Sequence, residues 1–500
     1  MGLIARQSSK HFIVSILSMS VGIINNIFIY PKFFALYGFL QAFRSIGDLL
    51  LPCSMLGLNP VMVRFKHLLQ KGKNNAFAFG LIWFFVSSSI ALVVIYFSKN
   101  YIIEVFSGVF KNIVLLEDYN LEILIGIYLM GIATILTSVS LINNRIVVPA
   151  MLTNFVISKL GFPIIVIISS YFLYPNEGLI WLYLGLLTLL VLLLLGYTVK
   201  NKFVQFTKLK LTEFKKHKDE VFNFGLYSVL DSIGVKLAFG IDIIMINVLI
   251  GNEASGIYAV FLFLSRVVSF PLASIDKISN PSISGFWAKN ELDKIKKLYQ
   301  QSGITILTVS FGIFLLIYHS MDDILFIMKK VELVEAKFIF LFVAGAMVLN
   351  SITSVNSPIL VYSKKYRWNL FFTLILALIN VILTYYFITY IFEDPYKSAG
   401  AACSTAISLI VFNYLKMGFI YAQFKIHPFT KETFMVLGLG LATFVLFHYI
   451  PLFSTGWISM FVRSGLIALI YGGIVYYLKI SPDLNAMINQ QLLAVKNYIK

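Results

Sequence analysis

Apolar stretches about 20 residues long recur along almost the whole 500-residue chain, and they limit what it can fold into. A helix needs about 20 apolar residues to cross the hydrocarbon core of a bilayer. The chain is 59% hydrophobic and 13% charged, whereas soluble domains average about 45–50% and about 25%. This small number of charged residues cannot cover a water-facing surface. Lipid must therefore cover most of the protein. The sequence therefore predicts an all-α membrane protein with about 14 transmembrane helices.

The predicted spans have ends that are set to within about 2–4 residues. In chain order they are 12–30, 39–61, 76–97, 121–142, 147–173, 178–199, 221–249, 256–275, 303–318, 338–362, 368–391, 398–420, 433–450 and 457–477. The first segment has no small-residue cleavage site after it, so we expect an uncleaved helix and not a signal peptide.

The loop charges orient these spans. If the N-terminus is cytoplasmic and the sides alternate, about 27 Lys and Arg lie in inner loops and about 6 in outer loops. Basic clusters such as Lys200–Lys218 then lie inside, and acids such as Glu177, Glu253 and Glu393 lie outside. This bias accounts for the net charge of +17 without a nucleic-acid partner. We expect a multi-pass protein of the bacterial inner membrane with both termini in the cytoplasm.

Two similar halves are suggested by a repeat about 221 residues apart. Tyr37, Arg44 and Asn59-Pro60 in the first half correspond to Tyr258, Arg266 and Asn280-Pro281 in the second. An offset of about six helices keeps both halves in one orientation, as in transporters built from parallel repeats. The predicted domains are a six-helix lobe at 1–199, a basic linker at 200–220, a second six-helix lobe at 221–424, an additional helix pair at 425–480 and an amphipathic cytoplasmic tail at 481–500. The lobes would be related by a pseudo-twofold axis.

Three passages resemble one transporter family. They are IFIYPKFFALYGFLQAFRSIGDLLLPCSMLGLNPVMVRF, GIDIIMINVLIGNEASGIYAVFLFLSRVVSFPLASIDKISNPSISGFW and SAGAACSTAIS. The chain is similar here to polysaccharide (lipid-linked oligosaccharide, O-antigen-type) flippases of the multidrug/oligosaccharidyl-lipid/polysaccharide exporter superfamily. The resemblance implies two six-helix lobes that alternate access around a central cavity. The extra C-terminal helix pair looks like that of the lipid II flippase branch.

Charged residues deep in predicted spans are candidates for the substrate site, because a charge at the bilayer centre costs at least about 2.5–3.5 kcal/mol. The cations are Arg44, Lys159, Lys236 and Arg266, and the acids are Asp48, Asp231 and Asp242. Arginine grips phosphate oxygens bidentately and lysine acts as a point charge, so the excess of cations suits a pyrophosphate headgroup. The family resemblance implies such a cationic cavity, with an arginine in the eighth helix that Arg266 matches.

Structural roles remain as alternatives for each of these charges. Arg44 and Asp48 are four residues apart and could simply neutralise each other. Asp231 and Asp242 share a helix face, where they would bind a coupling proton or sodium ion or partner cations on other helices. Lys337, Lys416 and Arg463 lie nearer helix ends, where long side chains snorkel to water.

Other polar groups point to no chemistry. Asp322–Asp323 would be a solvated outer-loop charge run. Cys53 and Cys403 do not have the spacing of metal ligands.

The C-terminal segment after a Ser481 cap is predicted to form an amphipathic helix, because apolar residues recur in it at helical spacing: Leu484, Ile488, Leu492, Val495 and Ile499. Aromatic residues make up 16% of the chain, and some could stack on sugars, although the sequence does not indicate which.

The sequence therefore favours a flippase that moves an undecaprenyl-pyrophosphate-linked oligosaccharide to the outer leaflet for cell-surface or exopolysaccharide biosynthesis. A cation-coupled multidrug antiporter and a lipid II flippase of the same superfamily remain alternatives. We expect no enzyme activity, no cofactor, no metal and no nucleic-acid partner. The expected partners are the lipid-linked glycan, membrane lipids, a coupling proton or sodium ion, and other polysaccharide-assembly membrane proteins.

Overall fold

The computed structural model describes residues 3–65, 76–107, 119–143, 145–204, 218–331, 333–449 and 455–499. Every regular element within these ranges is a helix, which confirms the predicted all-α class. The chain forms two compact units, residues 1–259 and 260–500. Each unit is described by itself.

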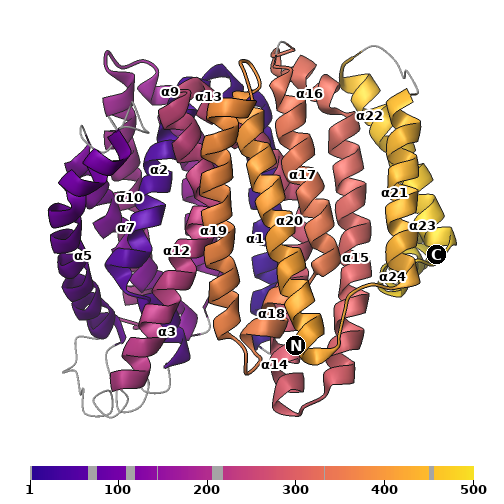
Figure 1. The fold of residues 1–500 in the computed structure, drawn as a ribbon, viewed down its shortest axis with the longest axis horizontal. Coiled ribbons are helices and arrows are strands. Elements are labelled where there is room, and N and C mark those ends of the chain that lie inside the picture. Colours follow the sequence, from indigo (N-terminus) through magenta and orange to yellow (C-terminus); the bar gives the residue numbers. More distant parts are fainter. Residues whose placement is uncertain are drawn as a thin grey trace. The chain divides into compact units, whose positions relative to one another are not determined.

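The first unit contains the helices from α1 to the start of α13 (Figure 1). Its elements are α1 (Leu3–Phe28), η1 (Tyr30–Lys32), α2 (Phe34–Met55), α3 (Leu58–Arg64), α5 (Ala76–Ser107), α7 (Asn120–Ile142), α8 (Val147–Ala150), η2 (Met151–Gly161), α9 (Phe162–Ser169), α10 (Pro175–Lys200), α12 (Lys218–Leu249) and the start of α13 (Asn252–Val268). Helix α2 packs against α5, α7, α10 and α12, so it lies at the centre of this unit.

The second unit continues α13 and carries the C-terminal helices. Its elements are α14 (Phe270–Ala288), α15 (Leu292–His319), α16 (Met321–Met328), α17 (Glu335–Thr353), α18 (Asn356–Val361), α19 (Arg367–Tyr386), η3 (Phe387–Ile391), α20 (Lys397–Phe424), α21 (Lys431–Tyr449), α22 (Trp457–Ile467), η4 (Ala468–Gly472), α23 (Gly473–Tyr477) and α24 (Pro482–Ile499). Helix α17 packs between α15 and α20.

Helices lie at every predicted span, but fewer of them meet the length and hydropathy of a membrane span. In the described residues ten helices do so. The other four predicted spans, at α2, α5, α12 and α13, do not meet both criteria within the described residues, where α5 and α12 contribute the shorter apolar parts Ala76–Ala91 and Gly240–Leu249. The protein is a multi-pass membrane protein, and the count of fourteen stays a prediction.

Three predicted spans end earlier than the apolar pattern indicates. Helix α2 stops where Leu56 (φ 40°) and Gly57 (φ 67°) are left-handed, and α17 stops at Ser354 (φ 41°). Helix α13 ends at Val268, and α14 begins at Phe270. The hydropathy stays high across each break, so periodicity alone did not reveal them.

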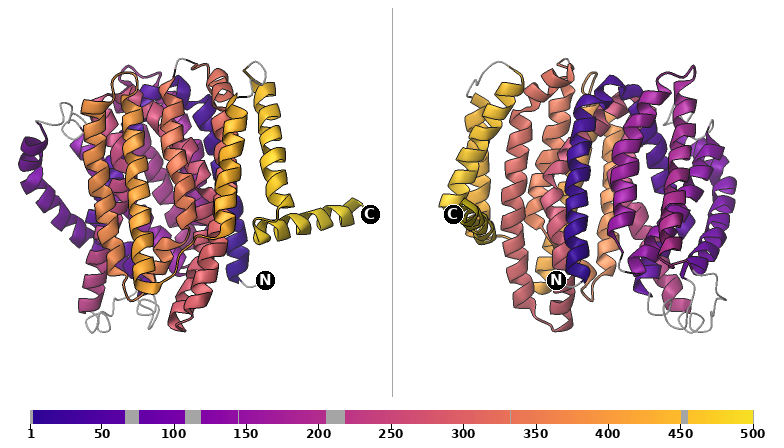
Figure 2. Two further views of the ribbon diagram at one scale, coloured as in Figure 1. Left: turned by 45° about the vertical axis from the view of Figure 1, so that its right-hand side comes forward. Right: turned by 180° about the vertical axis from the view of Figure 1, so that it is seen from behind.

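The C-terminal helix pair packs on α15 of its own unit. A Cβ on Gly440 of α21 would lie 2.6 Å from ring atoms of Phe311, and the Tyr471 hydroxyl donates to the Thr308 carbonyl at 3.1 Å. Helix α24, which follows this pair, lies roughly perpendicular to α21 (Figure 2). The Ser481 hydroxyl accepts a 3.5 Å hydrogen bond from the Leu484 amide, which confirms the predicted cap. The side chains of Leu492, Val495 and Ile499 lie outside the described residues.

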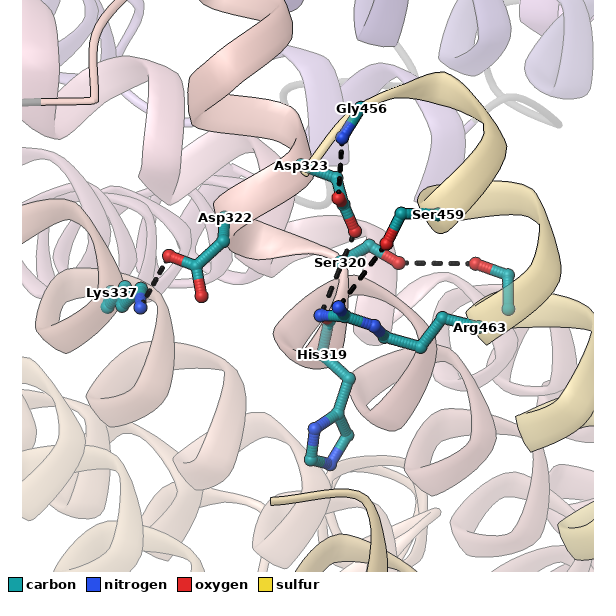
Figure 3. Close-up of polar contacts among 9 residues, drawn as sticks. His319, Ser320, Asp322, Asp323, Lys337, Gly456, Ser459 and Arg463 are labelled. Atoms are coloured by element: carbon teal, nitrogen blue, oxygen red, sulfur yellow. Dashed lines mark hydrogen bonds and ion pairs between the residues drawn. The ribbon is translucent and has the colours of Figure 1, made fainter. Parts of the chain in front are cut away.

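The prediction for Asp323 as a solvated charge is wrong. Its side chain is fully buried, accepts a 3.0 Å hydrogen bond from the Gly456 amide and lies 3.8 Å from the Arg463 guanidinium (Figure 3). Arg463 also donates to the His319 carbonyl at 2.5 Å. Asp322, one residue earlier, pairs with Lys337 at 2.5 Å on the surface. The adjacent acids therefore point to opposite environments, because successive residues of α16 lie about 100° apart.

Of the cations expected to snorkel, Lys416 is buried and Arg463 is partly buried instead. Arg463 is 16% exposed and belongs to the Asp323 contact. Lys416 is 1% exposed, donates to the Ser357 hydroxyl at 2.7 Å and lies 4.4 Å from the Phe412 ring centroid. Both satisfy the rule that a buried charge needs polar partners, and the helix pattern alone does not supply those partners.

Candidate functional site

Glycines fix α12 along α2 in the first unit. Gly57 lies so close to α12 that a Cβ there would stand 2.4 Å from the Gly225 carbonyl oxygen. At the other end of α2, a Cβ on Gly38 would stand 1.9 Å from the Asn252 carbonyl oxygen, and one on Gly256 2.0 Å from that of Phe34. Small residues allow helix backbones to touch in membranes. Helix α2 is therefore held at both ends.

This contact brings Asp48 and Lys236 to the same height. Asp48 precedes Gly57 by nine residues and Lys236 follows Gly225 by eleven, so both lie roughly the same distance from the close approach, at about 1.5 Å per helical residue. The Lys236 ammonium donates to the Asp48 carboxylate at 3.0 Å. The structure thus joins two charges that are 188 residues apart in sequence.

Arg44 completes a group of three charges. Its Nε lies 3.8 Å from the second carboxylate oxygen of Asp48. The side chains of Arg44, Asp48 and Lys236 are 33%, 26% and 43% exposed, so the group is neither sealed nor on an open surface. One carboxylate is shared by two cations, which leaves a net charge of about +1. Asp48 therefore contacts a second cation besides Arg44.

Aromatic rings border the same group. The Arg44 guanidinium lies 5.1 Å from the ring centroid of Phe162 at the start of α9. The Tyr183 ring of α10 lies 5.8 Å from Phe162 and 6.0 Å from Phe43. A guanidinium over a ring is stabilised electrostatically and keeps its N–H donors at the ring edge for a ligand. The arrangement can bind an anion beside an aromatic wall.

Lys159 and Asp242 have other surroundings in the same unit. Lys159 lies on the η2 segment, its side chain is half-buried, and its carbonyl accepts a 2.6 Å hydrogen bond from the Asn25 amide. Asp242 is 1% exposed and accepts a 3.0 Å hydrogen bond from the Tyr258 hydroxyl.

Two further predicted site residues are placed less fully. Arg266 lies on α13 with an exposed side chain between buried neighbours, in the part of the chain that belongs to the second unit. The Asp231 side chain lies outside the described residues, although its backbone is part of α12. The structure thus brings together Arg44, Asp48 and Lys236, and their roles in binding stay a proposal.

The sequence reasoning missed the Tyr258 partner of Asp242, although a signal was present. Helix α12 ends at Leu249 and α13 begins at Asn252. A connection this short makes the two helices antiparallel neighbours, so residues at similar distances from it lie at one height. The aromatic wall around Arg44 had no such signal, because Phe162 and Tyr183 come from distant helices.

Among the described residues no cluster of three or more His, Cys, Asp or Glu has the arrangement of a metal site. The charged group of the first unit combines the two cations Arg44 and Lys236 with the one carboxylate of Asp48.

Comparisons with known proteins agree on the fold. No protein-family model matches the chain. The lipid II flippase MurJ, in an inward closed conformation, superposes with a TM-score of 0.70 at 16% identity, over 94% of this chain and 99% of that one. Two structures of a multidrug resistance MATE family transporter of the MOP superfamily are also similar. The inward-facing form has a TM-score of 0.58 at 11% identity, over 82% of this chain and 94% of that one. The outward-facing form has a TM-score of 0.55 at 14% identity, over 85% of this chain and 97% of that one.

One curated relative adds a sequence match. A Haloferax volcanii protein described as the probable low-salt glycan biosynthesis flippase Agl15 is 24% identical over 205 residues. The match covers 41% of this chain and 42% of that protein, so it spans less than half the length of the relative. These comparisons support the resemblance stated from the sequence, and they show the fold of these transporters over nearly the whole chain.

Proposed function

We propose that this protein is a flippase for an undecaprenyl-pyrophosphate-linked oligosaccharide, and that it moves the glycan headgroup to the outer leaflet by alternating access. The observation that carries the proposal is the Arg44–Asp48–Lys236 group with its net charge of about +1. A multidrug antiporter that exports cations needs an acidic site, and this group is basic. The glycan flippase and the lipid II flippase among the similar proteins support the same substrate class.

The pyrophosphate is the part of such a substrate that bilayer transit opposes most. Its charge loses hydration when it leaves the interface. Arg44 offers a fork of donors and Lys236 a mobile ammonium, which together replace water around phosphate oxygens. In this proposal Asp48 pairs with both cations when the site is empty and releases Lys236 to the arriving phosphate. Lys159 and Arg266 are proposed as further contacts, and Asp231 and Asp242 as ion-coupling or charge-partner groups.

Lipid II is a second candidate substrate. The MurJ likeness covers 94% of this chain, and the MATE likenesses cover 82–85%. That greater coverage favours the lipid II flippase branch over the drug exporters, as does the additional helix pair.

We further propose the cell setting and the domain plan from the sequence. The protein lies in a bacterial inner membrane with both termini in the cytoplasm, as the distribution of Lys and Arg predicts. The functional lobes are residues 1–199 and 221–424, joined by the basic linker and followed by the helix pair.

Binding of undecaprenyl pyrophosphate to the purified protein in nanodiscs tests the substrate class. We expect the Lys236→Gln and Arg44→Gln variants to bind at least tenfold more weakly, since a hydrogen bond to a charged group contributes about 1.5–3 kcal/mol. Lys294→Gln is the matched control, because its 2.9 Å pair with Glu291 lies on the surface of the other unit. Equal binding by wild type and both site variants would refute the headgroup role.

A further inference from the structure

A hollow of about 400 Å³ lies at one end of the second unit, where α17 begins, η3 ends and α20 begins. Its lining residues are Phe338, Phe342, Ile391, Phe392, Glu393, Tyr396 and Ala399. All belong to residues 260–500, so the hollow is formed within one unit. Its size falls among those of small-ligand pockets, about 300–1,000 Å³. The predicted topology puts this end at the outer face of the membrane.

Two rings form a corner in this hollow. The ring centroids of Phe338 and Tyr396 lie 5.5 Å apart with planes at 90°. Phe338 is 39% exposed and Tyr396 is 37% exposed, so a ligand can reach both rings. Phe342 follows one turn later on α17, with its ring centroid 6.3 Å from that of Phe338. The corner offers one flat face for stacking and a second face for the edge of the same ligand.

The opposite wall is fixed by the backbone of α20. A Cβ on Gly400 would lie 2.9 Å from the Phe392 ring, so this glycine lets the ring lie flat on the helix. The Phe392 amide donates to the Phe387 carbonyl at 2.9 Å, and the Tyr396 amide donates to the Glu393 carbonyl at 2.7 Å. The segment between η3 and α20 is thus shaped before any ligand arrives.

The lining chemistry identifies the ligand class. The seven lining residues comprise four aromatic rings, two small or aliphatic side chains and the carboxylate of Glu393, with no cation among them. A pyranose sugar has an apolar C–H face, which stacks on aromatic rings, and a rim of hydroxyls, which donate to carboxylates. A phosphate would meet a carboxylate and no cation, so the hollow does not suit a lipid headgroup phosphate. Aromatic anchors at a membrane interface need no carboxylate in a hollow.

We propose that this hollow binds a hexose ring of the translocated glycan at the outer face. Phe338 and Tyr396 would hold the sugar in their corner, and Glu393 would accept hydrogen bonds from its hydroxyls. The proposal rests on the proposed flippase function, and it gives the second unit a sugar site that is separate from the charged group of the first unit. Binding there would favour the state in which the glycan lies at the outer face.

Saturation-transfer difference NMR on the full-length protein in nanodiscs tests the site with free sugars. The probes are glucose, galactose, mannose and N-acetylglucosamine. We expect at least one of them to receive saturation, with binding about two- to tenfold weaker in Tyr396→Ala, because the sugar loses one of the two rings of the corner. Glu393→Gln, at an exposed position, should also weaken binding while leaving the fold intact. Tyr390→Ala is the matched control, since Tyr390 is 67% exposed nearby and is not among the lining residues.

The possible outcomes separate this proposal from the proposed function. If no sugar receives saturation, or if the Tyr396 and Glu393 variants bind as wild type does, the sugar site is refuted. Magnetisation transfer from lipid acyl chains to the Phe338 and Tyr396 rings would also refute the sugar site, because it would show that lipid occupies the hollow. A leaflet assay on the wild-type protein tests the flippase function independently. If wild type binds sugar but does not flip the glycan, the flippase function is refuted and the sugar site is not.

Discussion

Removal of the buried carboxylate of Asp323 should loosen the C-terminal helix pair from its unit. Asp323 is fully buried and lies 3.8 Å from Arg463, which is 16% exposed. The Asp323→Asn variant would leave the guanidinium with the His319 carbonyl and the Ser459 hydroxyl but without its counter-ion. Breaking a buried pair by removal of one partner costs about 3–5 kcal/mol. At about 1.4 kcal/mol per tenfold, the lower figure corresponds to about 150-fold easier opening.

Hydrogen exchange detected by mass spectrometry measures this opening directly. We expect the amides of residues 456–464 to exchange about 100-fold faster in Asp323→Asn, while the amides of α17 keep their wild-type rate. The neighbouring variant Asp322→Asn is the matched control. Its pair with Lys337 is 51% and 39% exposed, and exposed pairs contribute about 0–1 kcal/mol. Similar exchange in the two variants would refute the argument that burial, and not charge alone, sets the strength of the Asp323 contact.

Three other perturbations follow from the first unit. Gly38→Ala should prevent folding, because the new methyl group would lie 1.9 Å from a carbonyl oxygen. The measurement is loss of the monodisperse peak in size-exclusion chromatography in detergent. The control Gly185→Ala, with no atom within 4 Å of the added methyl group, should keep that peak. Tyr258→Phe should lower stability by about 1–3 kcal/mol, seen in denaturant unfolding, because buried Asp242 loses a hydroxyl donor, and an unchanged midpoint would contradict this. Asp48→Asn should raise the net charge of the Arg44–Asp48–Lys236 group from about +1 to about +2. Undecaprenyl pyrophosphate should then bind more tightly, and its affinity should fall more steeply with salt. Weaker binding would contradict this prediction.

The sequence predicted the helices well because each span must carry its own apolar run. Hydropathy registers length and composition, and both are local properties. The breaks after Met55 and Thr353 were missed because they depend on left-handed residues inside apolar sequence, held by neighbouring helices. The Ser302 hydroxyl, for example, lies 2.7 Å from that of Ser354, across 52 residues of sequence.

The candidate site could be predicted as a set of residues but not as a geometry. Depth in the membrane selected Arg44, Asp48 and Lys236 as charges that need explanation. Their mutual contact required the position of α12 along α2, which Gly57 and Gly225 determine through a backbone approach. The same limit explains Asp323, whose partner Arg463 lies 140 residues later on a helix of the additional pair. Pairwise contacts between helices need the packing, and the packing depends on both helices together.

The leaflet distribution of the lipid-linked glycan in cells depleted of this protein tests the central claim most directly. Lipids would be labelled with a membrane-impermeant probe and then extracted, with wild type or Lys236→Gln supplied at equal expression. Our account predicts that undecaprenyl-pyrophosphate-linked glycan accumulates on the cytoplasmic side, and that wild type but not Lys236→Gln restores it to the outer leaflet. An unchanged leaflet distribution after depletion, with raised sensitivity to cationic drugs, would contradict the account and indicate a multidrug antiporter.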